Sequence, residues 1–345
     1  MRLRAELLLA NFSSRTVDAG GRNLRILIPQ PGRTRSIASS LGSAAPHVRV
    51  GPVLRLGRAP AKLNLTLELT GRRADGYHEL AAVSQTIGWS DVVGVEVEGT
   101  DWLNPCRLTV AGPHGAQVPH GEQNILMRAV SLLRSSGRAD PISRLVLEKR
   151  IPTKSGLGGG SADAAALIRL AARGPTDDVL LKIALQCGAD VPFALVGGAA
   201  VVGGVGDVLA PLAPLTKGVF LVAILGEVST AAAYGAVRPE DFSSGDRTAA
   251  VVRSMDAGEL PDPALLGSAL LPAALRVSST LAERFGCLRS ATPGVSWSMT
   301  GSGGAFFTLL DGPEEAAREA RAVALGCPGV PLRAVLPEPG WLAQT

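Results

Sequence analysis

The sequence predicts an α+β fold with two lobes. Apolar residues make up 46% of the 345 residues and charged residues 19%, a composition typical of a globular protein with one large or two medium cores. Strand-like and helix-like segments are mixed without the regular alternation that builds a doubly wound parallel sheet. We expect one domain over residues 51–210 and a second over 211–345, because a new strand-like segment and a run of turn-forming residues follow this boundary.

Basic residues are concentrated at the start of the chain. Residues 1–50 contain eight arginines and no lysine against Glu6 and Asp18, which gives this segment a net charge of +6. The whole chain carries +4, so the remaining residues carry −2. A near-neutral body with 4% aromatic residues lacks the basic surface and the stacking groups that nucleic acids require. We therefore expect no nucleic-acid partner. We also expect no membrane partner, since no apolar run approaches the roughly 18 to 20 residues of a membrane helix.

The segment 1–50 is predicted to be a flexible extension outside the folded body of the protein. Its arginine and serine content, with few acids, suits either an organelle transit peptide or an incidental upstream extension. The four cysteines are scattered without a CxxC pair, which favours a reducing compartment over a disulfide framework or a zinc cluster. The expected location is the bacterial cytoplasm, or a plastid if the segment is a transit peptide. Composition predicts no particular oligomeric state.

The first ordered element is a strand that begins near Val53. Leucines at 63, 65, 67 and 69 alternate with polar residues, which is the period of a half-buried strand. Lys62 and Asn64 then share the polar face. Such a face is commonly only solvated, so the pattern alone leaves open whether the two residues take part in catalysis.

Apolar periodicity and turn residues predict the main elements after this strand. We expect helices over 124–134, 161–173, 180–187 and around 270–285, with strands over 145–151 and 219–225 and a strand pair over 295–299 and 305–310. Gly188 is expected to end the third helix.

A glycine-rich segment, Pro152 to Ser161, lies between a predicted strand and the start of a predicted helix. Glycines let backbone N–H groups approach a ligand, and a helix N-terminus adds free donors and partial positive charge, so the segment suits a phosphate. The spacing fits neither a Walker A loop nor a dinucleotide fingerprint. A purely structural alternative is a tight turn after which Ser161 caps the helix.

Three segments together resemble the GHMP kinases. They are Pro60-Ala-Lys-Leu-Asn-Leu, Pro152-Thr-Lys-Ser-Gly-Leu-Gly-Gly-Gly-Ser, and Thr300-Gly-Ser-Gly-Gly-Ala near the C-terminus. The resemblance implies the two-lobed GHMP kinase fold, with the active site in the cleft between the lobes, and ATP and Mg²⁺ as cofactors. It implies ATP-binding roles for Asn124, Pro152, Gly156, Gly158, Gly159, Gly160, Ser161, Gly301 and Gly303, with Ser161 also near the metal.

Two further segments resemble the branch of GHMP kinases that acts on a cytidine diphosphate-linked methylerythritol. In Gly188-Ala-Asp-Val-Pro-Phe, the resemblance makes Asp190 the catalytic carboxylate and implies that Lys62 meets it across the fold. In Asp75-Gly-Tyr-His, it implies that Tyr77 stacks on cytosine and that His78 recognises its edge. Asn64 would then help to position this small-molecule substrate. Without the resemblance, an aspartate in such a turn most often bonds its own backbone.

The implied activity is ATP-dependent phosphorylation of the 2-hydroxyl of 4-diphosphocytidyl-2-C-methyl-D-erythritol, in the non-mevalonate pathway of isoprenoid synthesis. Two alternatives remain: a GHMP kinase for a mevalonate-type or homoserine-type alcohol, and a non-catalytic nucleotide-binding regulator on the same scaffold. The sequence departs from the common family pattern at Asp163 and at Ser268-Ala-Leu, and the second departure leaves the contacts of the C-terminal lobe open.

Overall fold

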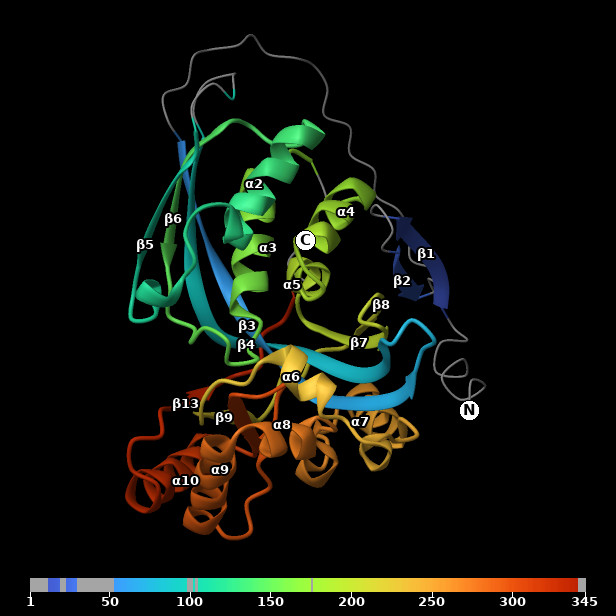
Figure 1. Cartoon of the computed structure of the whole chain (residues 1–345), viewed down its shortest axis with the longest axis vertical. Coiled ribbons are helices and arrows are strands. Elements are labelled where there is room, and N and C mark those ends of the chain that lie inside the picture. Colours follow the sequence, from blue (N-terminus) through green and yellow to red (C-terminus); the bar gives the residue numbers. More distant parts are fainter. Residues whose placement is uncertain are drawn as a thin grey trace.

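A computed structural model describes residues 12–18, 23–29, 53–97, 102, 105–174 and 176–340. These residues form two β-sheets with helices packed against them, which agrees with the predicted α+β class (Figure 1). Within this part of the chain the larger sheet has nine strands: β1 (Phe12–Asp18), β2 (Asn23–Pro29), β3 (Val53–Arg72), β4 (His78–Val97), β5 (Arg107–Ala111), β6 (Ile142–Glu148), β7 (Ala199–Gly204), β8 (Val208–Leu212) and β10 (Gly267–Ser268). The smaller sheet consists of β9 (Val219–Ile224), β11 (Ser298–Met299), β12 (Ala305–Leu310) and β13 (Leu332–Val335).

The long antiparallel pair β3–β4 is the spine of the molecule. β4 pairs with β7 near its start and with β6 near its end, on the side away from β3. The ladder between β3 and β4 shifts register at three places, and one shift lies between Pro60 and Lys62. Such irregularities bend a strand and redirect its side chains. In Figure 1, this pair of strands runs from the upper group of helices to the lower group.

Residues 59–69 of β3 are buried on both faces, which corrects the prediction of a half-buried strand. Leu63 and Leu65 pack against the smaller sheet, in a cluster that includes Phe220 and Phe307. The polar alternates Lys62, Asn64, Thr66 and Glu68 are also at most 8% exposed. The alternation in the sequence is real, but the polar face meets protein rather than water.

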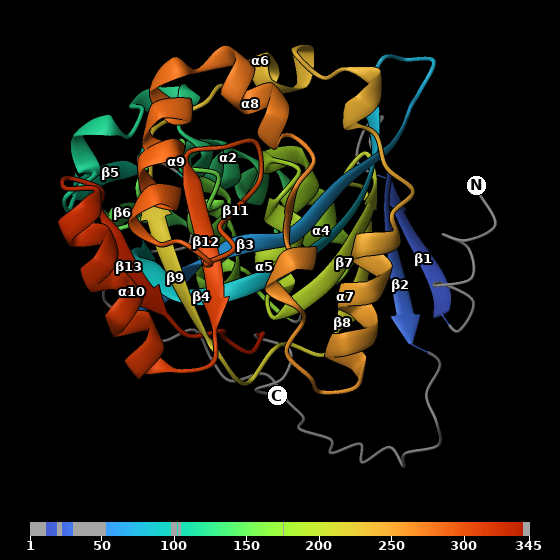
Figure 2. The ribbon, with the colours of Figure 1, turned by 90° about the horizontal axis from the view of Figure 1, so that it is seen from below.

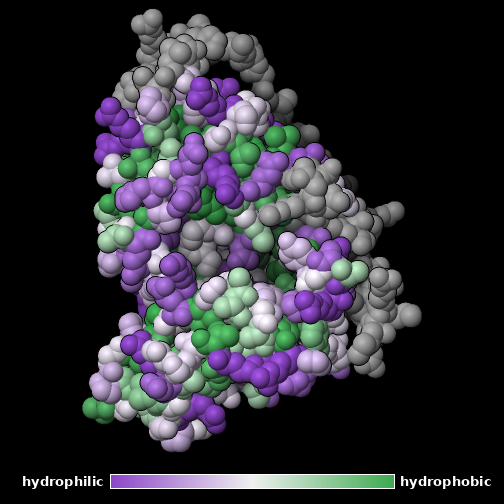
Figure 3. Space-filling model, viewed as in Figure 1, coloured by the Kyte–Doolittle hydropathy of each residue, from purple (hydrophilic) through white to green (hydrophobic). Residues whose placement is uncertain are grey.

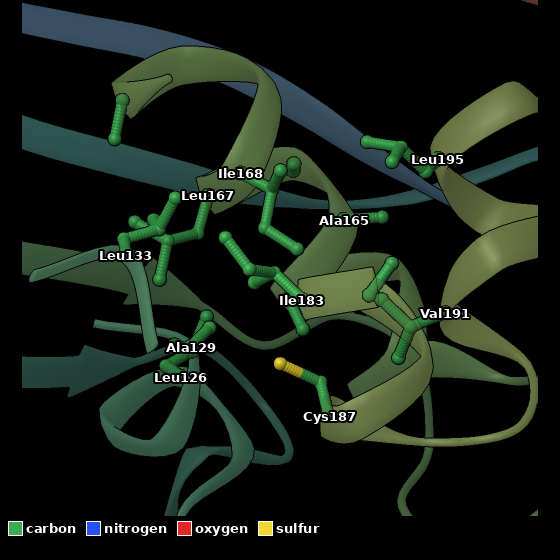
Figure 4. Packing of buried hydrophobic residues seen from close by; sticks show 14 of the residues in the cluster. Leu126, Ala129, Leu133, Ala165, Leu167, Ile168, Ile183, Cys187, Val191 and Leu195 are labelled. Carbon is green, nitrogen blue, oxygen red and sulfur yellow. The ribbon is translucent and has the colours of Figure 1, made fainter. Parts of the chain in front are cut away.

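Four helices cover the upper part of the larger sheet: α2 (Ile125–Ser136), α3 (Gly159–Ala171), α4 (Asp178–Cys187) and α5 (Val191–Val196). Their apolar faces meet in one buried cluster with residues of β4 and β6. Figure 4 shows side chains of α2, α3 and α4 pointing toward one another in this cluster, with Leu133, Ile168 and Ile183 near its centre. The predicted helices over 124–134, 161–173 and 180–187 are confirmed, although α3 begins two residues before Ser161.

The lower part contains α6 (Thr230–Gly235), α7 (Asp246–Asp256), α8 (Leu271–Val277), α9 (Ser279–Ala291) and α10 (Pro313–Gly326). α9 and α10 lie beside the smaller sheet in Figure 2 and share a buried cluster with it. Single 3₁₀ turns occupy Gly115–Gln117, Gly121–Gln123, Pro239–Asp241 and Pro263–Leu265. The predicted strand pair is present, although its first strand, β11, has only two residues.

Several elements were not predicted, among them β1, β2 and α5. β1 and β2 form an antiparallel hairpin inside the segment that we expected to be a flexible extension, and β2 pairs in parallel with β8. The rest of residues 1–50 lies outside the described residues. α5 begins at Val191, and Pro192 lies in its first turn, where a missing N–H costs nothing.

Two global features complete the description. None of the described helices combines the length and the apolar content needed to cross a bilayer. Hydrophilic and hydrophobic residues are intermixed on the face drawn in Figure 3. The predicted domain boundary after residue 210 falls inside β8, shortly before the chain passes from the larger sheet to the smaller one at β9, and it stays a prediction.

Candidate active site

A cleft of about 690 Å³ opens beside the spine, and segments far apart in the sequence line it. Most of the predicted site residues are among its lining: Lys62, Asn64, Tyr77, His78, Gly156, Gly158, Ser161, Asp190 and Gly301. Five others do not line it: Asn124, Pro152, Gly159, Gly160 and Gly303. Each of the five sequence motifs therefore contributes at least one residue to the cleft, including the predicted catalytic aspartate.

Lys62 and Asp190 form an ion pair in this cleft. Nζ of Lys62 lies 3.6 Å from Oδ2 of Asp190, and the same ammonium donates a 2.5 Å hydrogen bond to Oδ1 of Asn64. The side chain of Lys62 is 10% exposed, whereas that of Asp190 is 53% exposed. The pair thus consists of an anchored cation and a carboxylate that faces the open space of the cleft.

Asp190 does not use its side chain to hold its own turn. It occupies the N-cap position of α5, yet its carboxylate accepts no capping hydrogen bond. The local role that is common for an aspartate in a turn is therefore absent. Its carboxylate is available to a ligand.

Asn64 is fixed from several directions. Its Nδ2 donates to Oγ of Ser84 at 2.9 Å, while its backbone N–H donates to Oγ1 of Thr300 at 2.8 Å. Ser84 and Thr300 were not among the predicted site residues. Ser84 has no distinctive local sequence, whereas Thr300 opens the third segment that resembles the GHMP kinases. The contacts of both residues with Asn64 depend on the fold.

The glycine loop lies directly against Lys62. The backbone N–H of Lys62 donates to the carbonyl of Leu157 at 2.9 Å, and a Cβ on Gly158 would come within 3.0 Å of Cγ of Lys62. Gly158 also has φ +69°, a left-handed conformation that favours glycine. A glycine at this position therefore lets the loop pack onto the lysine.

The loop leads into α3, which begins at Gly159. Gly158 is the N-cap and supplies no side-chain acceptor, and Ser161 makes no capping bond either. The structural alternative in which Ser161 caps the helix is therefore wrong. Free N–H donors and the partial positive charge of a helix N-terminus are features that bind phosphate oxygens.

The glycine loop and the third GHMP segment, residues 300–305, touch each other. A Cβ on Gly156 would lie 2.8 Å from the carbonyl oxygen of Thr300, and Ala305 N–H donates to the carbonyl of Ser155 at 2.8 Å. The carbonyl of Gly301 accepts a 2.8 Å hydrogen bond from Oγ of Ser268. Ser268 belongs to the segment that departs from the family pattern, and it thus supports the third motif.

Tyr77 and His78 line the cleft at the turn between β3 and β4. The ring of Tyr77 is exposed, with 66% of the residue accessible. The imidazole of His78 packs against Tyr234 and Phe242, at centroid distances of 5.4 and 5.7 Å. Partial burial and the charge of Arg72 lower the pKa of His78, so its ring is neutral at neutral pH and offers one donor and one acceptor.

Tyr234 faces the same space from α6. Burial, together with the charge of Asp190, raises the pKa of its phenol to about 12, so the hydroxyl stays protonated. Nearby, the hydroxyls of Thr230 and Ser302 share a 2.8 Å hydrogen bond, which joins α6 to the third GHMP segment, residues 300–305. Thr230 and Tyr234 were not among the predicted site residues, whereas Ser302 lies within the third segment that resembles the GHMP kinases.

The five predicted residues outside the cleft lining contact neighbouring parts of the protein or form the first turn of α3. Asn124 is the N-cap of α2: its Oδ1 accepts from Leu126 N–H and its Nδ2 donates to the carbonyl of Pro119, both at 2.8 Å. The carbonyl of Pro152 accepts from Oγ of Ser155. Gly159 and Gly160 form the first turn of α3, and Gly303 packs on Val228. Direct contact of these residues with ATP stays a prediction.

A buried charge network lies beneath the glycine loop, and we did not predict it. Nζ of Lys149 bonds Oδ2 of Asp91 at 2.5 Å and Oδ2 of Asp163 at 2.7 Å, and all three side chains are at most 4% exposed. Burial raises the pKa of the Asp163 carboxyl well above its usual range. A charged residue within an apolar strand, as at Asp91 in β4, is the signal that could have revealed the network.

The described residues include no group of three or more His, Cys, Asp or Glu side chains that could hold a metal. Mg²⁺ commonly binds through substrate phosphates with one or two protein groups, so such a cluster is not required. Ser161 fits one such position, because its hydroxyl lies in the cleft lining at the start of α3.

Comparisons with known proteins give the family. The family model for the GHMP kinases N terminal domain matches residues 124–198. The chain is 40% identical over 270 residues to 4-diphosphocytidyl-2-C-methyl-D-erythritol kinase of Thermus thermophilus, covering 77% of this chain and 91% of the relative. It is 35% identical over 308 residues to the enzyme of the same name from Xanthobacter autotrophicus, covering 84% and 97%.

Solved structures agree with these similarities. A crystal structure of 4-(cytidine 5'-diphospho)-2C-methyl-D-erythritol kinase superposes with a TM-score of 0.66 at 36% identity, covering 82% of this chain and 99% of that one. Homoserine kinase from Cytophaga hutchinsonii shares the fold, with a TM-score of 0.62 at 17% identity over 86% and 98% of the two chains. The predicted two-lobed kinase fold is thereby confirmed, and the chain belongs to the family of 4-diphosphocytidyl-2-C-methyl-D-erythritol kinases within the GHMP kinases.

Proposed function

We propose that the protein transfers the γ-phosphoryl group of ATP to the 2-hydroxyl of 4-diphosphocytidyl-2-C-methyl-D-erythritol, giving the 2-phosphate and ADP in the non-mevalonate pathway of isoprenoid synthesis. One observation carries the proposal most directly. The ion pair of Lys62 and Asp190 lies beside a glycine loop at a helix N-terminus, in a cleft that Tyr77 and His78 also line. Relatives of this name at 35–40% identity support the same activity.

Asp190 acts as the general base in this proposal. An alcohol is a poor nucleophile, and a carboxylate within hydrogen-bond reach orients it and takes its proton as the bond from oxygen to the γ-phosphorus forms. The bond between the γ-phosphorus and the bridging oxygen breaks in the same step, and ADP leaves with the electron pair. The absence of a capping bond at Asp190 suits this role, because no backbone group competes for its oxygens.

Lys62 is the electrostatic partner of Asp190. Its ammonium is held by Asn64 and its methylene carbons lie against Gly158 of the glycine loop, so its charge is fixed between the carboxylate and the phosphate side of the cleft. A cation at this position stabilises negative charge that develops on the phosphoryl oxygens. Asn64 fixes the lysine and offers its amide to the substrate.

The triphosphate of ATP is proposed to lie along the glycine loop. The backbone N–H groups at the start of α3 and of the loop before it would bind its oxygens, as helix N-termini bind phosphate. Mg²⁺ would be held by these phosphates and the hydroxyl of Ser161, where it offsets the charge of the triphosphate. Asn124 would then support the ATP site through the start of α2.

Cytosine is proposed to bind at the turn between β3 and β4. An aromatic face and a neutral imidazole supply the stacking surface and the edge hydrogen bonds that a pyrimidine needs. Tyr77 presents an exposed ring, and His78 is held by its contacts with Tyr234 and Phe242.

We expect the change Tyr77→Ala to weaken substrate binding much more than ATP binding. Base stacking on an aromatic side chain is worth about 1–3 kcal/mol, so the KM for the cytidine substrate should rise about five- to a hundredfold. The KM for ATP should stay within about twofold, since the triphosphate is bound by other residues. Steady-state kinetics with each substrate varied in turn measures both values, and equal losses for the two substrates would argue against a cytosine platform.

An ADP-release assay with three alcohols tests the proposed function as a whole. We expect turnover with 4-diphosphocytidyl-2-C-methyl-D-erythritol and none above background with mevalonate or homoserine. Turnover of mevalonate or homoserine, without turnover of the first compound, would exclude the proposed substrate and leave only the GHMP kinase chemistry. No turnover of any of the three would instead favour a nucleotide-binding regulator.

A further inference from the structure

Arg72 is a cation of the cleft whose charge the proposed mechanism does not use. Two basic side chains, Lys62 and Arg72, line the cleft. Lys62 is paired with Asp190, but Arg72 makes no ion pair with any of the residues that the structure describes. The one side-chain hydrogen bond that it makes to the described residues is a weak contact, 3.5 Å from Nε to the carbonyl of Gly76. The guanidinium is therefore free to bind an anion from the cleft.

The position of Arg72 relative to His78 is fixed by the sheet. The two residues are direct partners in the antiparallel ladder of β3 and β4, at the last pair before the turn. The charge of Arg72 acts on the imidazole and lowers the pKa of His78, which agrees with their closeness. Arg72 thus lies beside the proposed cytosine site.

The neighbouring arginine has a different role. Arg73 forms an ion pair with Asp75 at 3.2 Å, its backbone N–H donates to the carbonyl of Tyr77, and it does not line the cleft. It therefore holds the turn that carries Tyr77. Of the two adjacent arginines, only Arg72 presents its charge to a ligand.

We propose that Arg72 is a specificity-determining residue that binds the diphosphate of the cytidine diphosphate-linked substrate. This inference rests on the proposed function. When cytosine lies at Tyr77 and His78 and the acceptor hydroxyl lies at Asp190, the diphosphate that joins these two parts spans the cleft between them. A planar guanidinium with several N–H donors is suited to pair with phosphate oxygens. Mevalonate-type and homoserine-type alcohols have no such group for Arg72 to bind.

The test compares Arg72→Ala with Arg58→Ala. Arg58 lies on the same strand and is paired with Glu338 outside the cleft lining, so it controls for loss of one exposed positive charge. We expect Arg72→Ala to raise the KM for the cytidine substrate about tenfold or more, as loss of a charge-assisted hydrogen bond predicts. Its KM for ATP should change by less than about twofold. Arg58→Ala should leave both values unchanged, and Arg72→Lys should recover part of the loss.

Titration calorimetry isolates the phosphate contact. With the ATP site saturated by a non-hydrolysable ATP analogue, Arg72→Ala should weaken binding of cytidine 5'-diphosphate but not of cytidine, whereas Tyr77→Ala should weaken both. If the wild-type protein turns over the substrate and Arg72→Ala binds both ligands as the wild type does, the inference about Arg72 is wrong and the proposed function stands. A rise in the KM for ATP alone would also overturn it. If the wild-type protein does not turn over the cytidine substrate, the proposed function itself fails.

Discussion

The change Asp190→Asn is expected to lower kcat by about 10² to 10⁴, the usual contribution of a positioned general base. The amide keeps the shape of the side chain but cannot accept the proton of the acceptor hydroxyl. The side chain is half exposed and caps nothing, so the protein should fold and bind ATP as before. Single-turnover measurements at saturating ATP and substrate would give the rate of the chemical step directly.

A matched control for this variant is Asp256→Asn. Asp256 is an exposed aspartate at the end of α7 and does not line the cleft. Its replacement removes the same charge and should leave kcat within about twofold. Turnover of Asp190→Asn near the wild-type rate would remove Asp190 from the mechanism, whatever the control shows.

The change Lys149→Met is expected to destabilise the fold by about 3–5 kcal/mol, because it leaves the carboxylates of Asp91 and Asp163 buried without their cation. The oxygens of Asp91 also accept the backbone N–H groups of Arg150 and Ile151, so the network holds the chain where it enters the glycine loop. Urea unfolding followed by circular dichroism would measure the loss as a fall in the transition midpoint.

Two comparisons make the Lys149 result specific. Lys182→Met removes an exposed lysine from α4 and should change the free energy of unfolding by less than about 0.5 kcal/mol. Adding Asp163→Asn to Lys149→Met should recover part of the loss, since one fewer buried carboxylate then lacks a partner. A loss below about 1 kcal/mol in the single variant would mean that water or another group reaches the network.

Local patterns in the sequence were sufficient for some of the elements but not for their surroundings. The alternation at 62–69 correctly predicts that Lys62 and Asn64 share a face, because side-chain direction in a strand depends only on position. It predicts the wrong exposure for that face, since the glycine loop and the C-terminal segments cover it from far along the chain. Burial of a polar face is a tertiary property that periodicity does not contain.

The site itself was predictable only where a resemblance supplied long-range information. Composition and spacing favoured a phosphate loop at Gly156 to Ser161, but the meeting of Lys62 with Asp190 was implied by the family alone. The network of Lys149 was missed for the same physical reason: its members come from β4, the end of β6 and α3, and only the folded sheet brings them together. Arg72 was passed over because an exposed arginine in a turn is ordinary in sequence, and its lack of an acidic partner becomes visible only in the cleft.

The most direct test of phosphoryl transfer in this cleft is ³¹P NMR of a reaction containing ATP and 4-diphosphocytidyl-2-C-methyl-D-erythritol, with two-dimensional carbon–phosphorus correlation to locate the new phosphate. We expect one new phosphomonoester signal coupled to C2 of the methylerythritol, growing in step with ADP while the diphosphate signals of the substrate persist. This signal should be absent with Asp190→Asn on the same time scale. A phosphate attached to another carbon, or release of inorganic phosphate alone, would contradict the proposed roles of Asp190, Lys62 and the glycine loop.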